Sequence, residues 1–275
     1  MSLLQQITET TRYIKNLYPQ APDVGIILGS GLVKFSSHIQ IEKEIPYKQI
    51  PNFPVATVDG HPGKMIFGKI AKKRVVAMAG RFHYYEGYSA KEVAYPVQVL
   101  HQLGIRSLLI TNAAGGVNPS YKVGDLMIIR DHISFAVVNP LLGKNEDQLG
   151  ARFPDMSEPY SLQLIALGKA IAAKCGIAVN EGVYFGVTGP TFETRSEYKM
   201  IRILGGDAVG MSTVQEVVTA AHLKLPVFAM SVITDIGIRD EHNIITHKEV
   251  LEAAQNAEPR LTSIFMELIA QLPEN

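Results

Sequence analysis

The strongest constraint on the fold is a recurring pattern in which an apolar stretch leads into a polar loop and then into a helix start. Each of these helix starts has a Ser or Thr followed three residues later by Glu, which is a capping box. In open α/β sheets, ligands bind beyond the carboxyl ends of the strands, where helix amino termini point N–H groups at them. We therefore predict an α/β fold whose loops converge on one site, although a single box is more often an ordinary helix start. The predicted boxes are Ser89–Glu92, Thr194–Glu197, Thr213–Glu216 and Thr246–Glu249.

Apolar runs of strand length alternate with helical patterns along the sequence, which predicts one α/β domain over residues 1–275. Helices are predicted over Met1–Lys15 and Leu162–Lys174, and Pro259 should kink or restart the last helix. The stretch Val137–Asp155 is rich in Asn, Pro, Gly and charge, and it predicts a long functional loop. The predicted strands are Val24–Leu28, Met65–Lys69, Val75–Ala79, Ser107–Asn112, Asp125–Ile129, Gly182–Val187, Asp207–Gly210 and Val227–Thr234.

Composition excludes several classes of protein. The 275 residues are 47% apolar and 19% charged, which is enough for a large buried core. The formal net charge of zero argues against a nucleic-acid-binding face and against a polybasic membrane anchor. We expect a cytoplasmic location, since no apolar run reaches spanning length and Met1–Lys15 lacks the pattern of a signal peptide. The single cysteine, Cys175, excludes an intrachain disulfide and is expected to be a small core residue.

The segment after the strand Val75–Ala79 carries the densest polar chemistry in the sequence. It presents Arg81, His83 and Tyr85 beyond one strand end, and the box at Ser89 begins a helix shortly afterwards. Because the strand and the helix hold both ends of the loop, its side chains should point to a fixed place. A guanidinium, an imidazole and tyrosines together suit an oxyanion that lies beside a flat or ring-shaped group.

Glycine-rich turns follow two other strands. The turn Gly29–Gly31 does not match a dinucleotide motif, because the third glycine would fall at Lys34, and no P-loop lysine follows. It either holds a small anion through Ser30 and backbone amides or is only a tight turn between strand and helix. Small residues in Asn112–Gly116 would let the backbone approach a ligand closely. Taken alone, His61 is equally well explained as a surface turn residue.

Five segments of the chain together resemble the purine nucleoside phosphorylases of the trimeric type, in order and over nearly the whole length. The resemblance implies a single α/β domain built on a distorted mixed β-sheet or barrel flanked by helices, and a homotrimer. It implies a glycosyltransferase of purine salvage that converts purine ribonucleosides or deoxyribonucleosides to the free base and α-pentose 1-phosphate. Phosphate would be the co-substrate, and no metal or organic cofactor would be required. The segments are Ile27–Leu32, Gly80–Tyr88, Thr111–Gly116, Gly189–Glu197 and Val209–Val217.

The resemblance also implies roles for individual residues, of which Arg81, His83, Glu193 and Asp235 are expected to carry catalysis. The phosphate ligands would be Ser30, His61, Arg81, His83, the backbone of Ala113, and Ser212. The nucleoside would contact Tyr85, Phe153, Phe192, Glu193, Val209, Met211, Thr234, Asp235, His247 and Val250.

The resemblance implies that the residues around the nucleoside contact different parts of it. Tyr85 would lie beside the ribose, Met211 under it and His247 near the 5′-hydroxyl. Phe153, in the long loop, would be lent to the adjacent subunit. For the base, Phe192 would supply a ring edge, and the Glu193 carboxylate suits acceptance from purine N1–H and a 2-amino group.

The chain departs from the family pattern at the base. Members specific for 6-oxopurines have an asparagine after the threonine that ends this strand, whereas here Thr234 is followed by Asp235. An ionised aspartate only accepts hydrogen bonds and favours a 6-amino group, yet Glu193 suits a 6-oxopurine. Two carboxylates in one partly desolvated pocket raise one of their pKa values, so that Asp235 can bind protonated and donate to N7 or O6. We expect inosine and guanosine as the main substrates, with adenosine admitted as well.

Rival functions remain open from the sequence. Methylthioadenosine phosphorylases share this fold and the aspartate, but they carry a second aspartate where this chain has Gly237. Ser212 and His247 instead suit a substrate with a free 5′-hydroxyl. Nucleosidases of related fold use water in place of phosphate, and a non-catalytic nucleoside or anion sensor would keep the same pocket. Phosphate-dependent release of base from inosine separates these functions.

Overall fold

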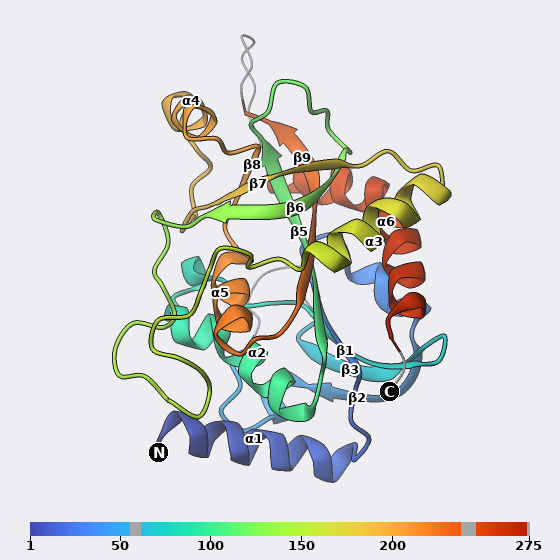
Figure 1. Cartoon of the computed structure of the whole chain (residues 1–275), viewed down its shortest axis with the longest axis vertical. Helices are drawn as coiled ribbons and strands as arrows, with labels where there is room; N and C mark the ends of the chain where they lie inside the picture. The colour runs from blue at the N-terminus through green and yellow to red at the C-terminus, as the bar shows by residue number, and fades with distance from the viewer. Residues whose placement is uncertain (56–61, 238–245, 274–275) are drawn as a thin grey trace.

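The computed structural model describes residues 1–55, 62–237 and 246–273, and Figure 1 shows how their helices and strands are arranged. The strands are β1 (Val24–Leu28), β2 (Gln40–Pro46), β3 (Lys64–Ile70), β4 (Lys73–Ala79), β5 (Ser107–Gly116), β6 (Leu126–Ile133), β7 (Asn180–Gly186), β8 (Ala208–Gly210) and β9 (Val227–Ile236). The α-helices are α1 (Leu3–Leu17), α2 (Ala90–Leu103), α3 (Leu162–Lys174), α4 (Arg195–Ile203), α5 (Val214–His222) and α6 (His247–Gln271). The short 3₁₀ helices are η1 (Val33–His38), η2 (Tyr47–Gln49) and η3 (Tyr84–Glu86).

The strands form one mixed sheet in the order β2-β3-β4-β1-β5-β8-β7-β6-β9. An additional pairing joins β5 to β9, so the last five strands in this order close into a barrel. The strands β1 to β4 extend from the barrel as an open wing. The predicted fold class, a distorted mixed sheet or barrel flanked by helices, is therefore confirmed.

Helices cover the sheet on both sides. Figure 1 shows α3 and α6 along one side and α2 and α5 along the other, with α1 packed against α2 at the open wing. Burial on both faces explains why β1 and most of β9 are apolar without alternation, as is usual for parallel strands covered by helices. No helix among the described residues is long and apolar enough to span a bilayer.

The strand directions bring four carboxyl ends to one place. β1 runs parallel to β4 and to β5, and β5 runs parallel to β9. The register between β5 and β9 shifts after Ala114, so that Gly115 pairs with Asp235 and Thr234 is the extra residue of a β-bulge. Bulges redirect side chains and occur often beside active sites. Here the bulge sets the direction of Thr234 and Asp235, the two polar residues near the end of β9.

Several sequence predictions hold closely and others are wrong. β1 and α3 have the predicted bounds, and the boxes at Ser89, Thr194 and Thr246 form. β2 was not predicted, because this edge strand pairs only with β3 and is mostly exposed, which leaves no apolar run to detect. α6 continues without a restart through Pro259. The expected core residue Cys175 is instead exposed, because it caps the end of α3.

Candidate active site

A cleft of about 340 Å³ lies at the carboxyl ends of the strands, and it collects nearly all of the predicted site residues. His61 lies outside the described residues, and Phe153 lines a different cavity. The predicted residues that do line the cleft are Ser30, Arg81, His83, Tyr85, Ala113, Phe192, Glu193, Val209, Met211, Ser212, Thr234, Asp235, His247 and Val250.

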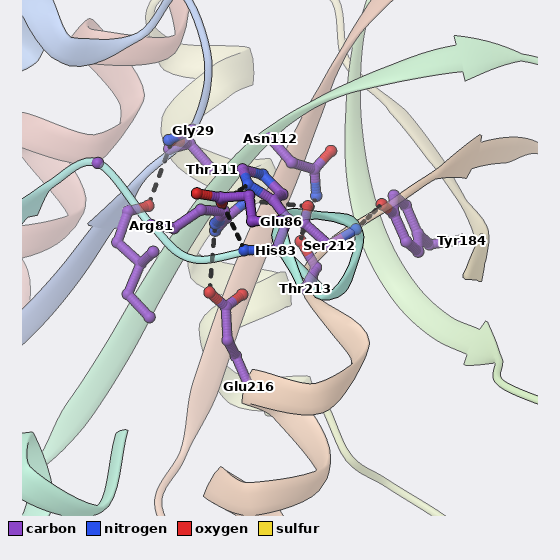
Figure 2. Close-up of polar contacts among 12 residues, drawn as sticks. Gly29, Arg81, His83, Glu86, Thr111, Asn112, Tyr184, Ser212, Thr213 and Glu216 are labelled. Atoms are coloured by element: carbon purple, nitrogen blue, oxygen red, sulfur yellow. Dashed lines mark hydrogen bonds and ion pairs between the residues drawn. The ribbon is translucent and has the colours of Figure 1, made fainter. Parts of the chain in front are cut away.

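Arg81 is the charge at the polar end of the cleft, and its guanidinium is held by two neighbours (Figure 2). Its side chain is 1% exposed. Nη1 donates to Ser212 Oγ at 3.0 Å, and Nε lies 3.2 Å from Glu216 Oε1. Burial raises the pKa of Glu216, and the neighbouring guanidinium partly opposes that rise. The carboxylate and the hydroxyl therefore fix the plane of the guanidinium before any ligand binds.

The predicted capping box at Thr213 is wrong, because the backbone there forms a turn that points Ser212 at Arg81. Thr213 has φ 72° and ψ −47°, and the Val214 amide donates to the Ser212 carbonyl at 2.7 Å. This is a γ-turn of the rare positive-φ kind, a strained conformation for a β-branched residue. The turn points Ser212 at Arg81 and lets Thr213 Oγ1 accept from Asn112 Nδ2 at 2.9 Å. Glu216 pairs with Arg81, and the Thr213 side chain makes no helix-capping bond.

His83 lies beside Arg81 and has a defined tautomer. Glu86 Oε1 accepts from the His83 backbone amide at 2.8 Å and lies 2.8 Å from Nδ1. Because a carboxylate can only accept, Nδ1 carries the proton in the neutral ring and Nε2 is the nitrogen with the lone pair. Burial lowers the pKa of His83, and the charges of Arg81 and His247 lower it further, while Glu86 opposes the shift. Tyr85 stacks on this imidazole at 4.7 Å between ring centroids.

Backbone from two strand ends completes the polar end. The Gly29 amide donates to Thr111 Oγ1 at 3.0 Å, which ties the end of β1 to β5 (Figure 2). A Cβ at Gly29 would lie 2.6 Å from the Thr111 carbonyl oxygen, so only glycine allows this approach. The Leu32 amide donates to the Gly29 carbonyl, which closes a tight turn with Ser30 at the cleft. The turn is thus a connection that also presents a hydroxyl to the cleft.

The opposite end of the cleft contains two carboxyl groups and a phenol. Asp235 is 7% exposed, and Thr234 Oγ1 lies 3.1 Å from its Oδ1. Tyr198 donates to its Oδ2 at 3.4 Å. Burial is the main cause that raises the pKa of Glu193, with the charges of Asp235 and Glu197 adding to it, and a hydrogen bond from Tyr198 opposing it. This end can therefore present both donors and acceptors to a flat heterocycle.

Comparisons with known proteins identify the family. A model of the phosphorylase superfamily matches residues 23–270. Purine nucleoside phosphorylase 1 of Geobacillus stearothermophilus is 46% identical over 271 residues, which cover 98% of this chain and 98% of that protein. The chain belongs to the purine nucleoside phosphorylases. The predicted family is confirmed.

Two solved structures share the whole fold. Purine nucleoside phosphorylase of Schistosoma mansoni in complex with adenosine superposes with a TM-score of 0.95 at 39% identity and covers 100% of both chains. The schistosoma enzyme in complex with hypoxanthine gives a TM-score of 0.95 at 38% identity, again over 100% of both chains. Those family members thus bind a 6-amino nucleoside and a 6-oxo base in the same architecture.

Three of the residues predicted to contact the nucleoside of a purine nucleoside phosphorylase lie in the wall or rim of the cleft, and His247 lies at a helix start. His247 is the first residue of α6, where Thr246 accepts from the Glu249 amide at 3.3 Å and so fixes the helix start. Phe192 is 41% exposed at the rim, whereas Val209 and Val250 are buried in the wall. Their contacts with a nucleoside stay predictions.

Phe153 is 86% exposed in the loop before α3 and lines a second cavity with Arg152, whose guanidinium carbon is 5.5 Å from the ring centroid. Such exposure is what a ring lent to another subunit of a purine nucleoside phosphorylase would have in an isolated chain. Its place in a neighbouring site stays a prediction.

Sequence reasoning missed three residues that organise this purine nucleoside phosphorylase site, namely Glu86, Glu216 and Tyr198. Glu86 was detectable, because it lies three residues after His83 at a strand end. Glu216 was read as a helix-capping residue, and Tyr198 was not singled out. In each of these two cases the partner is far away in sequence, so no local pattern reveals it. Among the described residues, no cluster of His, Cys, Asp and Glu could hold a metal ion.

Proposed function

We propose that this chain catalyses phosphorolysis of purine nucleosides, with phosphate at the Arg81 end of the cleft and the base at the Glu193 end. The observation that carries the proposal is the buried guanidinium of Arg81, which Glu216 and Ser212 hold beside a neutral His83. Charge-assisted donors around a desolvated site are what a dianion requires when it leaves water. Membership in the purine nucleoside phosphorylases supports the same activity.

Each phosphate ligand has a distinct part in this proposal. Arg81 and the hydroxyls of Ser30 and Ser212 donate to phosphate oxygens, as does a backbone amide at Ala113. His83 acts differently, because its Nε2 is an acceptor when the ring is neutral and Glu86 holds the proton on Nδ1. It therefore accepts from the P–OH of monohydrogen phosphate and leaves the other oxygens charged. One of those oxygens is the nucleophile.

The reaction needs stabilisation of charge more than a nucleophilic side chain. The glycosidic C1′–N9 bond lengthens, its electron pair goes to the base, and the sugar acquires oxocarbenium character. A phosphate oxygen then forms the new bond to C1′ from the opposite face. Hydrogen-bond donors at the base end stabilise the departing purine anion until it is protonated, and preorganised donors of this kind lower such barriers strongly.

The base specificity follows from the two carboxyl groups. A 6-oxopurine presents N1–H and O6, whereas adenine presents the N1 lone pair and N6–H₂. Glu193 and Asp235 together can match either set, which supports inosine, guanosine and adenosine as substrates. Asp235→Asn removes the ionisable acceptor, so adenosine kcat/KM should fall about tenfold relative to inosine, since bonds to charged groups are the stronger ones. Complete inactivity of the unchanged protein on adenosine would contradict the broad specificity.

The methylthioadenosine phosphorylase alternative has a structural argument against it. A Cβ at Gly237 would lie 2.0 Å from Tyr198 Cε1, so the buried ring of Tyr198 fills the space that a second aspartate would need. A nucleosidase uses water in place of phosphate, so it would not need the anion-binding groups of Arg81, His83 and Ser212. Release of hypoxanthine from inosine decides among these functions, because a phosphorylase requires phosphate, a nucleosidase does not, and a sensor releases no base.

We further propose that the active unit is a homotrimer in which Phe153 of one subunit covers the sugar site of the next. The 86% exposure of its side chain supports this role. Sedimentation velocity should give three times the mass of one chain. Phe153→Ala and Arg81→Ala should each be poorly active alone, and mixing them under conditions of subunit exchange should restore activity, because an intact cleft then receives an intact Phe153. A monomer, or mixtures with no recovery, would refute the shared site.

A further inference from the structure

One hydroxyl lies between the two carboxyl groups at the base end of the cleft. Tyr198 OH donates to Asp235 Oδ2 at 3.4 Å and is also a hydrogen-bond partner of Glu193. A phenol has one proton to donate and lone pairs that accept. It can therefore donate to only one of the two carboxyl groups at a time, while it accepts from the other.

The position of Tyr198 is built into the fold. Its side chain projects from α4 and is 3% exposed. The ring occupies space left by two glycines, since a Cβ at Gly237 would lie 2.0 Å from Cε1 and one at Gly115 would lie 3.4 Å from the hydroxyl. Gly115 pairs with Asp235 across the bulge between β5 and β9. The tyrosine is therefore fixed by packing beside the carboxyl group that the bulge orients.

We propose that Tyr198 is the specificity-determining residue of this site, because its hydroxyl lets one proton move between Asp235 and Glu193 and so matches the pocket to either 6-oxo or 6-amino purines. This inference rests on the proposed function. With the proton on Asp235, Glu193 is ionised, accepts from N1–H, and Asp235 donates to O6. With the proton on Glu193, that group donates to N1 of adenine and ionised Asp235 accepts from N6–H.

The proton count is the same in both states. Asp235 gives its proton to the Tyr198 oxygen as Tyr198 gives its own proton to Glu193, and the reverse transfer restores the first state. Either carboxyl proton then turns from the tyrosine to the bound base. The Thr234 hydroxyl, beside the other oxygen of Asp235, can also change the group to which it donates. It lies 3.1 Å from Asp235 Oδ1 and 3.3 Å from the Ala114 carbonyl oxygen. The hydroxyls of Tyr198 and Thr234 therefore keep a partner in either state.

The electrostatics of the site are consistent with one proton shared by the pair. Burial and the charges of Asp235 and Glu197 raise the pKa of Glu193. Burial and both carboxylates raise the pKa of Tyr198, so the phenol stays protonated and relays the proton without ionising.

The test is a double-mutant cycle of Tyr198→Phe and Asp235→Asn with inosine and adenosine as substrates. In the protein that keeps Asp235, Tyr198→Phe should lower the ratio of adenosine kcat/KM to inosine kcat/KM about tenfold. The reason is that ionised Asp235, which is more buried than ionised Glu193, loses a hydrogen-bond donor. In the Asp235→Asn background, the same change should leave the ratio constant. An unchanged ratio in the Asp235 background, or an equal change in both, would assign Tyr198 a purely structural role and overturn the proposal.

A second measurement uses the unaltered protein and does not depend on folding of a variant. Adenine and hypoxanthine are titrated by calorimetry in phosphate-containing buffers of different ionisation enthalpy, which gives the protons taken up on binding. The proposal requires equal uptake for both bases, because the pair keeps one proton throughout. Uptake that differs by about one proton would overturn it. Phosphate-dependent cleavage of inosine is measured separately, so failure of the proposed function is distinguishable from failure of the relay.

Discussion

Replacing Glu216 by glutamine isolates the charge that holds the phosphate-binding arginine. The variant keeps the shape of the side chain and an oxygen that can accept from Arg81 Nε, but it removes the negative charge 3.2 Å from that atom. At this separation and an effective dielectric constant of about 20, Coulomb's law gives about 5 kcal/mol. Breaking a buried ion pair by changing one partner costs about 3–5 kcal/mol in measured cases.

We therefore expect Glu216→Gln to lower the free energy of unfolding by about 3–5 kcal/mol in the absence of phosphate. Phosphate supplies negative charge to the same guanidinium, so it should bind the variant more tightly and return part of the loss. Tenfold tighter binding would recover about 1.4 kcal/mol once phosphate is well above both dissociation constants.

The assay is urea unfolding at fixed protein concentration, with and without phosphate, supported by calorimetric titration of phosphate. A matched control is Glu181→Gln, since Glu181 pairs with Lys169 at 2.8 Å and their side chains are 34% and 54% exposed. That change should cost less than about 1 kcal/mol at any phosphate concentration. A deficit for Glu216→Gln that phosphate leaves unchanged, or a cost as small as that of the control, would refute the reasoning.

Three further outcomes follow from the site. Arg81→Ala and His83→Ala should each lower phosphorolysis of inosine on the order of 100-fold at saturating phosphate, and unchanged turnover in both would contradict the phosphate assignment. Because burial lowers the pKa of His83, the native state binds fewer protons than the unfolded state, so the stability that this group contributes is full above about pH 6.5 and is lost as the pH falls through the native pKa. Urea unfolding should therefore show a steeper loss of stability in acid for the unaltered protein than for His83→Asn. Parallel curves for the two proteins would disprove this contribution of His83. Gly237→Ala would place Cβ 2.0 Å from the Tyr198 ring, so it should cost about 1–3 kcal/mol and weaken hypoxanthine binding, and a calorimetric titration that shows unchanged affinity would argue against this packing.

The sequence alone determined the elements whose signal is local. A covered parallel strand must be apolar along its length, so β1 was found with correct bounds. A capping box needs only residues three apart, so the helix starts after Ser89, Thr194 and Thr246 were found as well. The family followed from motifs that are themselves short segments, and nearly all residues implied by that resemblance line one cleft.

Only the tertiary structure decided how distant residues act on one another. Closure of the barrel through β5 and β9, the pairing of Arg81 with Glu216 and the γ-turn at Thr213 each depend on contacts between segments far apart in sequence. The same Thr-x-x-Glu pattern caps α4, yet the Thr213 side chain makes no capping bond, because its hydroxyl accepts from Asn112 while the Glu216 carboxylate pairs with Arg81. Local pattern therefore fixed the secondary structure, whereas long-range electrostatics and packing fixed the chemistry of the site.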